Sequence, residues 1–84
     1  MVADIFATCM PGQEKTVISN VRSLPDIVEV NGIMGRYDIF IKVDARDERV
    51  LHAAIANVRK IQPITSTLTF PVIRGQGGIT DDEK

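Results

Sequence analysis

The sequence predicts a small α+β domain with the element order βαββαβ, in which a four-stranded antiparallel sheet carries two helices on one face. Two segments place apolar residues at helical spacing, and four segments alternate apolar and polar residues as strands do. Together they form two strand–helix–strand halves of similar size, an arrangement typical of the ferredoxin-like fold. A chain of 84 residues is long enough for one such domain and too short for two.

The first half begins with a predicted strand over residues 2–9, VADIFATC, whose period of two separates two faces. One face is small and apolar: Ala3, Ile5, Ala7 and Cys9. A helix is predicted within residues 11–25, because this segment opens at Pro11-Gly12 and closes before Pro25. Its apolar residues recur at intervals of three and four: Val17, Ile18, Val21 and Leu24.

The middle of the chain predicts a hairpin. Residues 27–34, IVEVNGIM, and 38–43, DIFIKV, both alternate, and the turn between them crosses Gly35 to Tyr37. Ile39, Ile41 and Val43 share one face of the second of these strands, so Phe40 points the other way. Phe6 lies opposite Ile5 in the same manner. We expect Phe6 and Phe40 to project from the sheet face without helices and to form a dimer interface with a second copy.

The second half contains the clearest helix, over residues 47–61, with acidic residues early and basic residues late as the helix dipole prefers. After Pro63, residues 64–73 alternate Thr65, Thr67 and Thr69 with larger residues and predict a strand that ends near Pro71. The domain is expected to cover residues 1–73. Residues 74–84 have three glycines, three acids and little to bury, which predicts a flexible tail.

Composition excludes several classes of protein. A formal net charge of -1 and a pI near 5.7 give no general attraction to phosphate backbones, so direct nucleic-acid binding is not expected. The apolar runs are too short to cross a membrane. The one cysteine, Cys9, cannot form an intrachain disulfide and fits a reducing cytoplasm. A core this small without a disulfide favours a homo-oligomer.

No catalytic pair, metal site or cofactor is expected. His52 has no second histidine or cysteine at metal spacing and is expected to face solvent, while Cys9 is expected to be a packed thiol. The turn Gly35 to Asp38 has a purely structural explanation, with glycine for a positive φ and aspartate for a local hydrogen bond. Thr65, Thr67 and Thr69 are likewise good strand formers. Both explanations stay open beside ligand binding.

Four segments of the chain resemble the ligand-binding half of the Lrp/AsnC (feast/famine) transcription regulators, the RAM domain. They are PGQEKTVISNVRSLPDIVEV, GRYDIFIKV, VLHAAIANVRKI and TSTLT, and the resemblance covers roughly residues 2–73. The match is specific as a whole, with Gly35, Tyr37 and Asp38 forming its Gly-x-Tyr-Asp turn. Full-length members begin with a helix-turn-helix domain, whereas this sequence starts directly with the first strand. It therefore resembles a RAM domain without its own DNA-binding module.

The resemblance implies an assembly that binds amino acids. In the family, protomers pair through their sheets, dimers join into rings of eight or ten, and amino-acid effectors bind where dimers meet. Asp38 would accept a hydrogen bond from an α-ammonium group and Arg36 would pair with a carboxylate, unless it contacts a neighbouring subunit. The ligand-binding residues implied are seven: Met34, Gly35, Arg36, Tyr37, Asp38, Thr65 and Thr67. Full-length Lrp/AsnC regulators are the implied protein partners, so transcription would be influenced indirectly.

Two alternatives remain. Ferredoxin-like dimers with an enclosed cavity include small monooxygenases and isomerases, which would need a polar reactive group inside the cavity. The other alternative is a protein that only assembles, with an interface that holds no effector.

Overall fold

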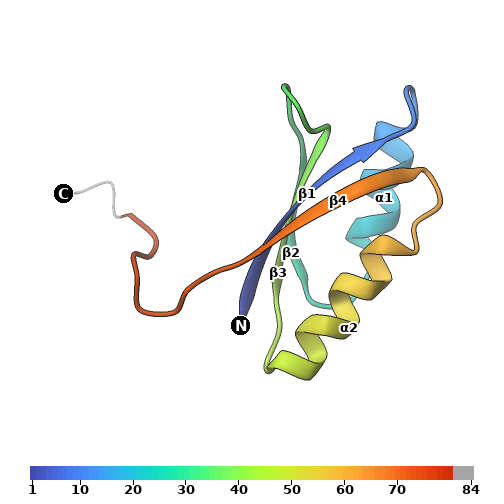
Figure 1. Ribbon diagram of the computed structural model, residues 1–84. Coiled ribbons are helices and arrows are strands. Elements are labelled where there is room, and N and C mark those ends of the chain that lie inside the picture. The colour runs from blue at the N-terminus through green and yellow to red at the C-terminus, as the bar shows by residue number, and fades with distance from the viewer. Residues whose placement is uncertain (81–84) are drawn as a thin grey trace.

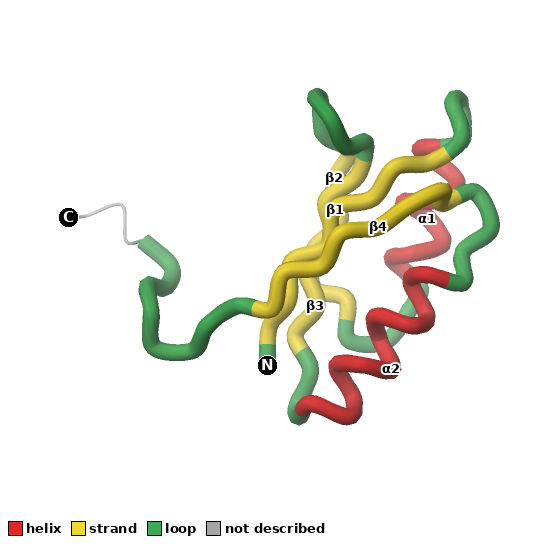
Figure 2. Tube along the Cα trace, in the orientation of Figure 1, coloured by secondary structure: helices red, strands yellow, loops and turns green. Residues whose placement is uncertain are grey.

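The computed structural model describes residues 1–80 and has the order βαββαβ (Figure 1). Its elements are β1 (Val2–Cys9), α1 (Glu14–Arg22), β2 (Ile27–Gly32), β3 (Ile39–Asp44), α2 (Glu48–Arg59) and β4 (Ile64–Pro71). The sheet order is β2-β3-β1-β4, and every neighbouring pair is antiparallel. Both helices cover the same face (Figure 2). The predicted ferredoxin-like α+β fold is confirmed.

The core lies between the helices and one face of the sheet. Along β1 the small apolar residues Ala3, Ile5 and Ala7 are buried, and each lies opposite a buried β3 residue in register. α1 contributes Val17 and Val21 to the core. α2 contributes Leu51, Ala54 and Val58. The two periodicities seen in the sequence, 2 and 3.6, therefore meet in one apolar layer.

The second face of the sheet has no helix over it, and we call it the open face. Phe6 and Phe40 project from it as predicted, directly opposite one another on β1 and β3. β4 adds two apolar residues that the sequence prediction had not assigned to this surface, Leu68 at 42% exposure and Phe70 at 50%. An exposed apolar surface of this kind is typical of a protein contact.

The helices start and end where the sequence indicates. Asp47 caps α2, since its Oδ1 accepts a hydrogen bond of 2.9 Å from the backbone N–H of Val50. Glu48 in the first turn and Arg59 in the last turn suit the helix dipole. No helix within residues 1–80 is long and apolar enough to cross a membrane.

The hairpin strands differ slightly from their predicted bounds. β2 ends at Gly32 and not at Met34, and β3 covers Ile39–Asp44 and not 38–43. The last pair in register is Gly32 with Ile39, and one further backbone bond, from the Ile33 N–H to the Asp38 carbonyl, follows it before the turn. Beyond β4 the chain runs away from the sheet without helix or strand up to residue 80 (Figure 1). Residues 81–84 of the predicted tail lie outside the described residues.

One expectation about β4 is wrong. The alternation in the sequence placed Thr65, Thr67 and Thr69 on one face, whereas the pairing with β1 shifts between Thr8 and Cys9. Thr8 pairs with Ser66 and Cys9 pairs with Ile64, which leaves Thr65 as an extra residue in a β-bulge. An extra residue reverses the alternation, so only Thr67 and Thr69 lie on the helix-covered face.

The core predicts a matched pair of substitutions. Val43→Ala removes two buried methyl groups from a side chain with no exposed surface, and we expect it to lower the free energy of unfolding by about 2 kcal/mol. Val28→Ala makes the same chemical change at a strand residue that is 59% exposed, and should change stability by less than about 0.5 kcal/mol. Urea denaturation at one protein concentration measures both. Equal losses would contradict the burial pattern.

Candidate functional site

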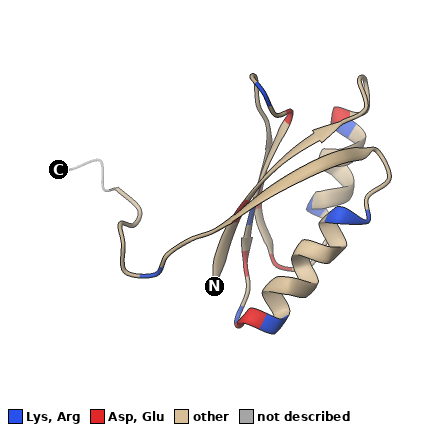
Figure 3. Cartoon of the chain, viewed as in Figure 1, with Lys and Arg blue, Asp and Glu red and all other residues tan. Residues whose placement is uncertain are grey.

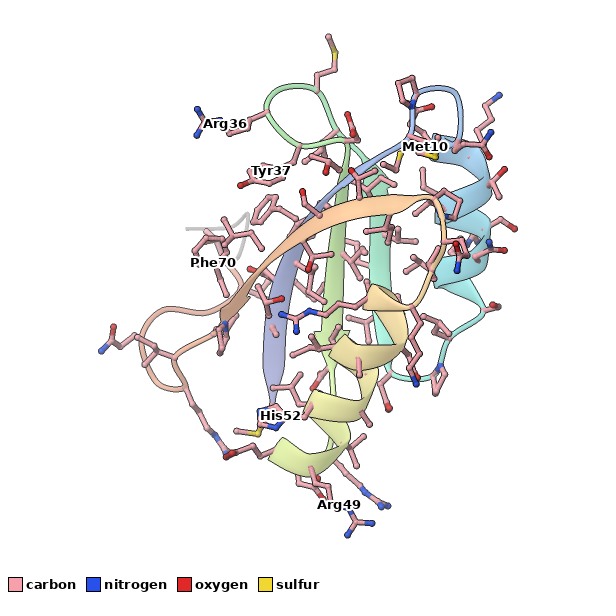
Figure 4. All side chains as sticks on the ribbon, turned by 45° about the vertical axis from the view of Figure 1, so that its right-hand side comes forward. Met10, Arg36, Tyr37, Arg49, His52 and Phe70 are labelled. Atoms are coloured by element: carbon pink, nitrogen blue, oxygen red, sulfur yellow. The ribbon has the colours of Figure 1, made fainter. Side chains whose placement is uncertain are left out.

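The turn between β2 and β3 lies at one end of the sheet, and residues 34–36 at its tip are exposed. Gly35 has φ 134°, a conformation that L side chains rarely adopt, and a Cβ added there would meet nothing within 4 Å. Glycine is therefore required by the backbone and not by crowding. Met34 is fully exposed, and Arg36 points outward from the turn (Figure 4).

Asp38 fastens this turn to the end of the central strand β1. Its Oδ2 accepts a 3.0 Å hydrogen bond from the backbone N–H of Cys9, and its own N–H donates to the Ala7 carbonyl at 2.9 Å. Its other carboxylate oxygen, Oδ1, accepts no hydrogen bond from residues 1–80. The predicted local hydrogen bond of the aspartate is thus present, made to a strand far away in sequence and not to the turn itself. One oxygen remains available to a ligand.

Three hydroxyl groups meet on the open face across β1 from this carboxylate, on the β4 side. Thr8 Oγ1 is 2.7 Å from Thr65 Oγ1 and 2.5 Å from Ser66 Oγ. Because Thr8 directly precedes Cys9, the hydroxyl cluster and the Asp38 carboxylate flank consecutive residues of β1. Of these three residues, Thr65 was predicted from the sequence as a ligand residue, and Thr8 and Ser66 were not. The β-bulge is what brings the hydroxyls of Thr65 and Ser66 to Thr8, and it depends on the pairing of β1 with β4, which are distant in sequence.

The predicted ligand residues fall into two groups. The turn residues 34–38 and Thr65 gather at the same end of the sheet, around the last two residues of β1. Thr67 does not join them, because it lies opposite the buried Ala7 and therefore on the helix-covered face.

Aromatic side chains connect this end of the sheet to the open face. Phe6 is the centre, with ring centroids 5.4 Å from Phe40, 5.7 Å from Tyr37 and 5.9 Å from Phe70. The tilted and edge-on geometries are favourable for aromatic pairs. Tyr37 and Phe70 lie on the same side of the sheet, away from the helices (Figure 4). Tyr37 is therefore part of both the turn and the apolar surface.

Cys9 is buried at the end of β1, and His52 is exposed on α2, as expected. Burial raises the pKa of the Cys9 thiol above its ordinary value of 9.0, and the negative charges of Glu14 and Asp38 raise it further. A thiol with a raised pKa is a poor nucleophile at neutral pH. No three metal-ligating side chains come together within residues 1–80.

A single chain does not enclose the turn. A hollow of about 520 Å³ lies elsewhere, where the start of β1, the start of α2 and the segment after β4 meet. It is lined by Arg46 and Arg74 and by apolar residues such as Leu51 and Val72, and no residue of the turn lines it. A ligand bound at the turn would need a second surface to cover it.

A protein-family model matches most of the chain. The model of the "Lrp/AsnC ligand binding domain" matches residues 5–75, which includes all six elements except the first three residues of β1. The family resemblance seen in the sequence is confirmed.

Two solved structures have the same fold. A hypothetical protein from Pyrococcus horikoshii is 27% identical, with a TM-score of 0.80, and the match covers 89% of this chain and 94% of that chain. AsnC of Escherichia coli is 26% identical with a TM-score of 0.80, and the match covers 95% of this chain and 55% of that chain.

A curated relative is an enzyme. A homocitrate synthase from Sulfurisphaera tokodaii is 41% identical over 51 residues, which is 61% of this chain. Those residues span about a tenth of that enzyme's length, since they cover 11% of it.

The raised pKa of Cys9 predicts a pH dependence of stability. A thiol that ionises less readily in the folded state contributes stability below its unfolded pKa, and this contribution is lost as the pH rises through the folded pKa. The free energy of unfolding should therefore fall more steeply above pH 9.0 in the wild type than in Cys9→Ala. Urea denaturation at pH values on both sides of 9.0 measures the two slopes, and parallel slopes would contradict the burial of the thiol.

The bond from Cys9 to Asp38 predicts a difference between two substitutions. Asp38→Ala leaves the partly buried Cys9 N–H without an acceptor and should cost about 1–3 kcal/mol of stability. Asp38→Asn keeps an oxygen acceptor at the same position and should cost less than half as much. Thermal denaturation of both variants gives the comparison. An equal loss in the two variants would assign the effect to charge and not to this hydrogen bond.

Proposed function

Because this chain belongs to the family of Lrp/AsnC ligand-binding domains, we propose that it is a non-enzymatic module that binds an amino acid and assembles with copies of itself. The observation that carries the proposal is the carboxylate of Asp38. One of its oxygens is fixed by the Cys9 N–H, and the other accepts no hydrogen bond from the described residues. A positioned carboxylate with a free oxygen is a suitable acceptor for an α-ammonium group.

The surroundings of this carboxylate suit the rest of an amino acid. Arg36 and the backbone of Gly35 can take the ligand carboxylate, and the hydroxyl cluster of Thr8, Thr65 and Ser66 offers donors and acceptors. Met34 and Tyr37 would contact the ligand from the turn. Thr67 lies on the helix-covered face, so of the seven predicted ligand residues it is the one to which we assign a structural role.

Assembly supplies the missing cover over the turn. We assign the first contact to the open face, where Phe6 and Phe40 meet their counterparts in a second copy, joined by Phe70 and Tyr37. Dimers then associate into a ring of eight or ten, with the effector between dimers. A full-length regulator with the same domain is the favoured partner, and the chain would then influence transcription by joining its assembly.

The similarity to homocitrate synthase favours a second candidate function, in which the same amino-acid site is used but the protein partner is an enzyme. A stretch of an enzyme resembles this chain, so the module would bind its amino acid and act on an enzyme by contact. The two candidates share the ligand site and differ in the protein partner. Capture with the tagged chain in the presence of the amino acid separates them, because one predicts a DNA-binding regulator and the other an enzyme.

The ligand site predicts a thermal shift with a free amino acid. Screening the twenty amino acids at millimolar concentration should identify at least one that raises Tm. At a concentration ten times Kd the gain is about 1.4 kcal/mol, which corresponds to about 5–10 °C for a domain of this size. Light scattering in the same samples measures whether the assembly changes. No shift with any amino acid would refute the proposal and leave the fold and the family untouched.

The control for this prediction is a matched charge change. Asp38→Asn should abolish the shift, since the amide keeps the Cys9 bond but cannot neutralise an ammonium group. Asp26→Asn makes the same change between α1 and β2, at φ 67°, which asparagine readily adopts, and should leave the shift intact. Loss of the shift in both variants, or in neither, would remove Asp38 from the site.

A further inference from the structure

Charged side chains interrupt the apolar surface of the open face in a single row. In register across the strands stand Glu29 on β2, Lys42 on β3 and Asp4 on β1, followed by Phe70 on β4. Figure 3 shows acidic and basic residues near one another on the strands of the sheet, while β4 carries none. The row lies directly beside the aromatic cluster, because Phe6 is two residues from Asp4 and Phe40 is two residues from Lys42.

Two members of this row are left without partners. Asp4 Oδ1 is buried and receives no hydrogen bond from the described residues. Lys42 forms no salt bridge with any residue of the described chain, although Asp4 and Glu29 stand on either side of it. Glu29, in contrast, already accepts a 2.7 Å hydrogen bond from the side-chain amide of Asn31. The unmatched groups are thus one carboxylate and one ammonium.

An apolar partner on this surface would leave the carboxylate stranded. Asp4 Oδ1 is already buried in one chain, and covering the aromatic residues removes water from the rest of this half-buried side chain. An ionised carboxylate without a partner is costly to bury. If Lys42 of the same chain does not pair with Asp4, the occupant of the open face must bring a cation to this position. A second copy of this chain carries such a cation on the same surface, in Lys42, together with the complementary aromatic residues.

We propose that Asp4 of one copy pairs with Lys42 of a second copy across the open face, in a two-fold dimer. A two-fold axis makes every contact twice, so one type of pair gives two ion pairs. Aromatic surfaces alone tolerate sliding, whereas two ion pairs at fixed positions select one orientation. The inference rests on the dimer of the proposed function and names the residues that fix its geometry.

A pair within one chain is the competing arrangement, since Asp4 and Lys42 face one another on adjacent strands. Charge reversal of single residues does not distinguish the two arrangements, because Asp4→Lys and Lys42→Asp would weaken either one. Mixing the two variants does. An Asp4→Lys chain carries two lysines and a Lys42→Asp chain carries two aspartates, so a mixed dimer has both pairs restored between copies and none within a copy.

The experiment is sedimentation analysis over a range of protein concentrations. We expect the wild type to dimerise and each single variant to self-associate at least about tenfold more weakly. An equimolar mixture of the variants should dimerise within about threefold of the wild type. Glu48→Lys, a reversal on α2 away from the open face, should behave as the wild type. Circular dichroism of each variant, and the double variant Asp4→Lys with Lys42→Asp, check that the chains fold.

Each other outcome overturns the pairing. If the mixture stays monomeric while the double variant dimerises, the pair lies within one chain. If the single variants dimerise as tightly as the wild type, the charges do not contribute, and the dimer of the proposed function survives alone. If the wild type is monomeric at every concentration, the open face takes a different occupant, and the dimer fails together with the pair.

Discussion

Two short helices cover one face of the four-stranded sheet, and the central strand divides its residues between the two environments that result. On β1, the side that faces the helices carries small and medium apolar groups, Ala3, Ile5, Ala7 and Cys9, and all four are buried. The other side holds Phe6, Asp4 and Thr8, which have no core to enter. A strand that lies in the middle of the sheet and alternates in this way contributes to both the core and the open face.

Much of this fold could be predicted from the sequence because it depends on local periodicity. The alternation of β1 and the helical spacing in α2 are contained in eight and twelve consecutive residues, and both elements were predicted within one or two residues of their bounds. The open face could also be predicted, because the two helices of a βαββαβ chain both cover one face of the sheet and leave the other uncovered. What failed was the face of Thr65, because a bulge belongs to the pairing of two strands and has no signature in either one.

The candidate site shows the same division between local and distant causes. Gly35 and Asp38 could be recognised from the turn, since a positive φ and a short carboxylate are what such turns use. Thr8 and Ser66 belong to strands separated by most of the chain, and only the sheet brings their hydroxyls together. The acceptor role of Asp38 toward Cys9 is similarly invisible in sequence. One oxygen of the Asp38 carboxylate therefore holds the fold, and the other oxygen of the same carboxylate is free to accept a hydrogen bond from a ligand.

The contact between Tyr37 and Phe6 has a thermodynamic consequence. Tyr37 belongs to the turn next to Asp38, and Phe6 is the centre of the open face, so the two surfaces share a packed pair of rings. An occupant of either surface that shifts these rings alters the free energy of occupying the other. Such coupling is reciprocal: a small molecule that strengthens association by a given factor is itself held more tightly by the associated form, by the same factor. The affinity of the chain for its effector would then depend on how much of the chain the cell contains.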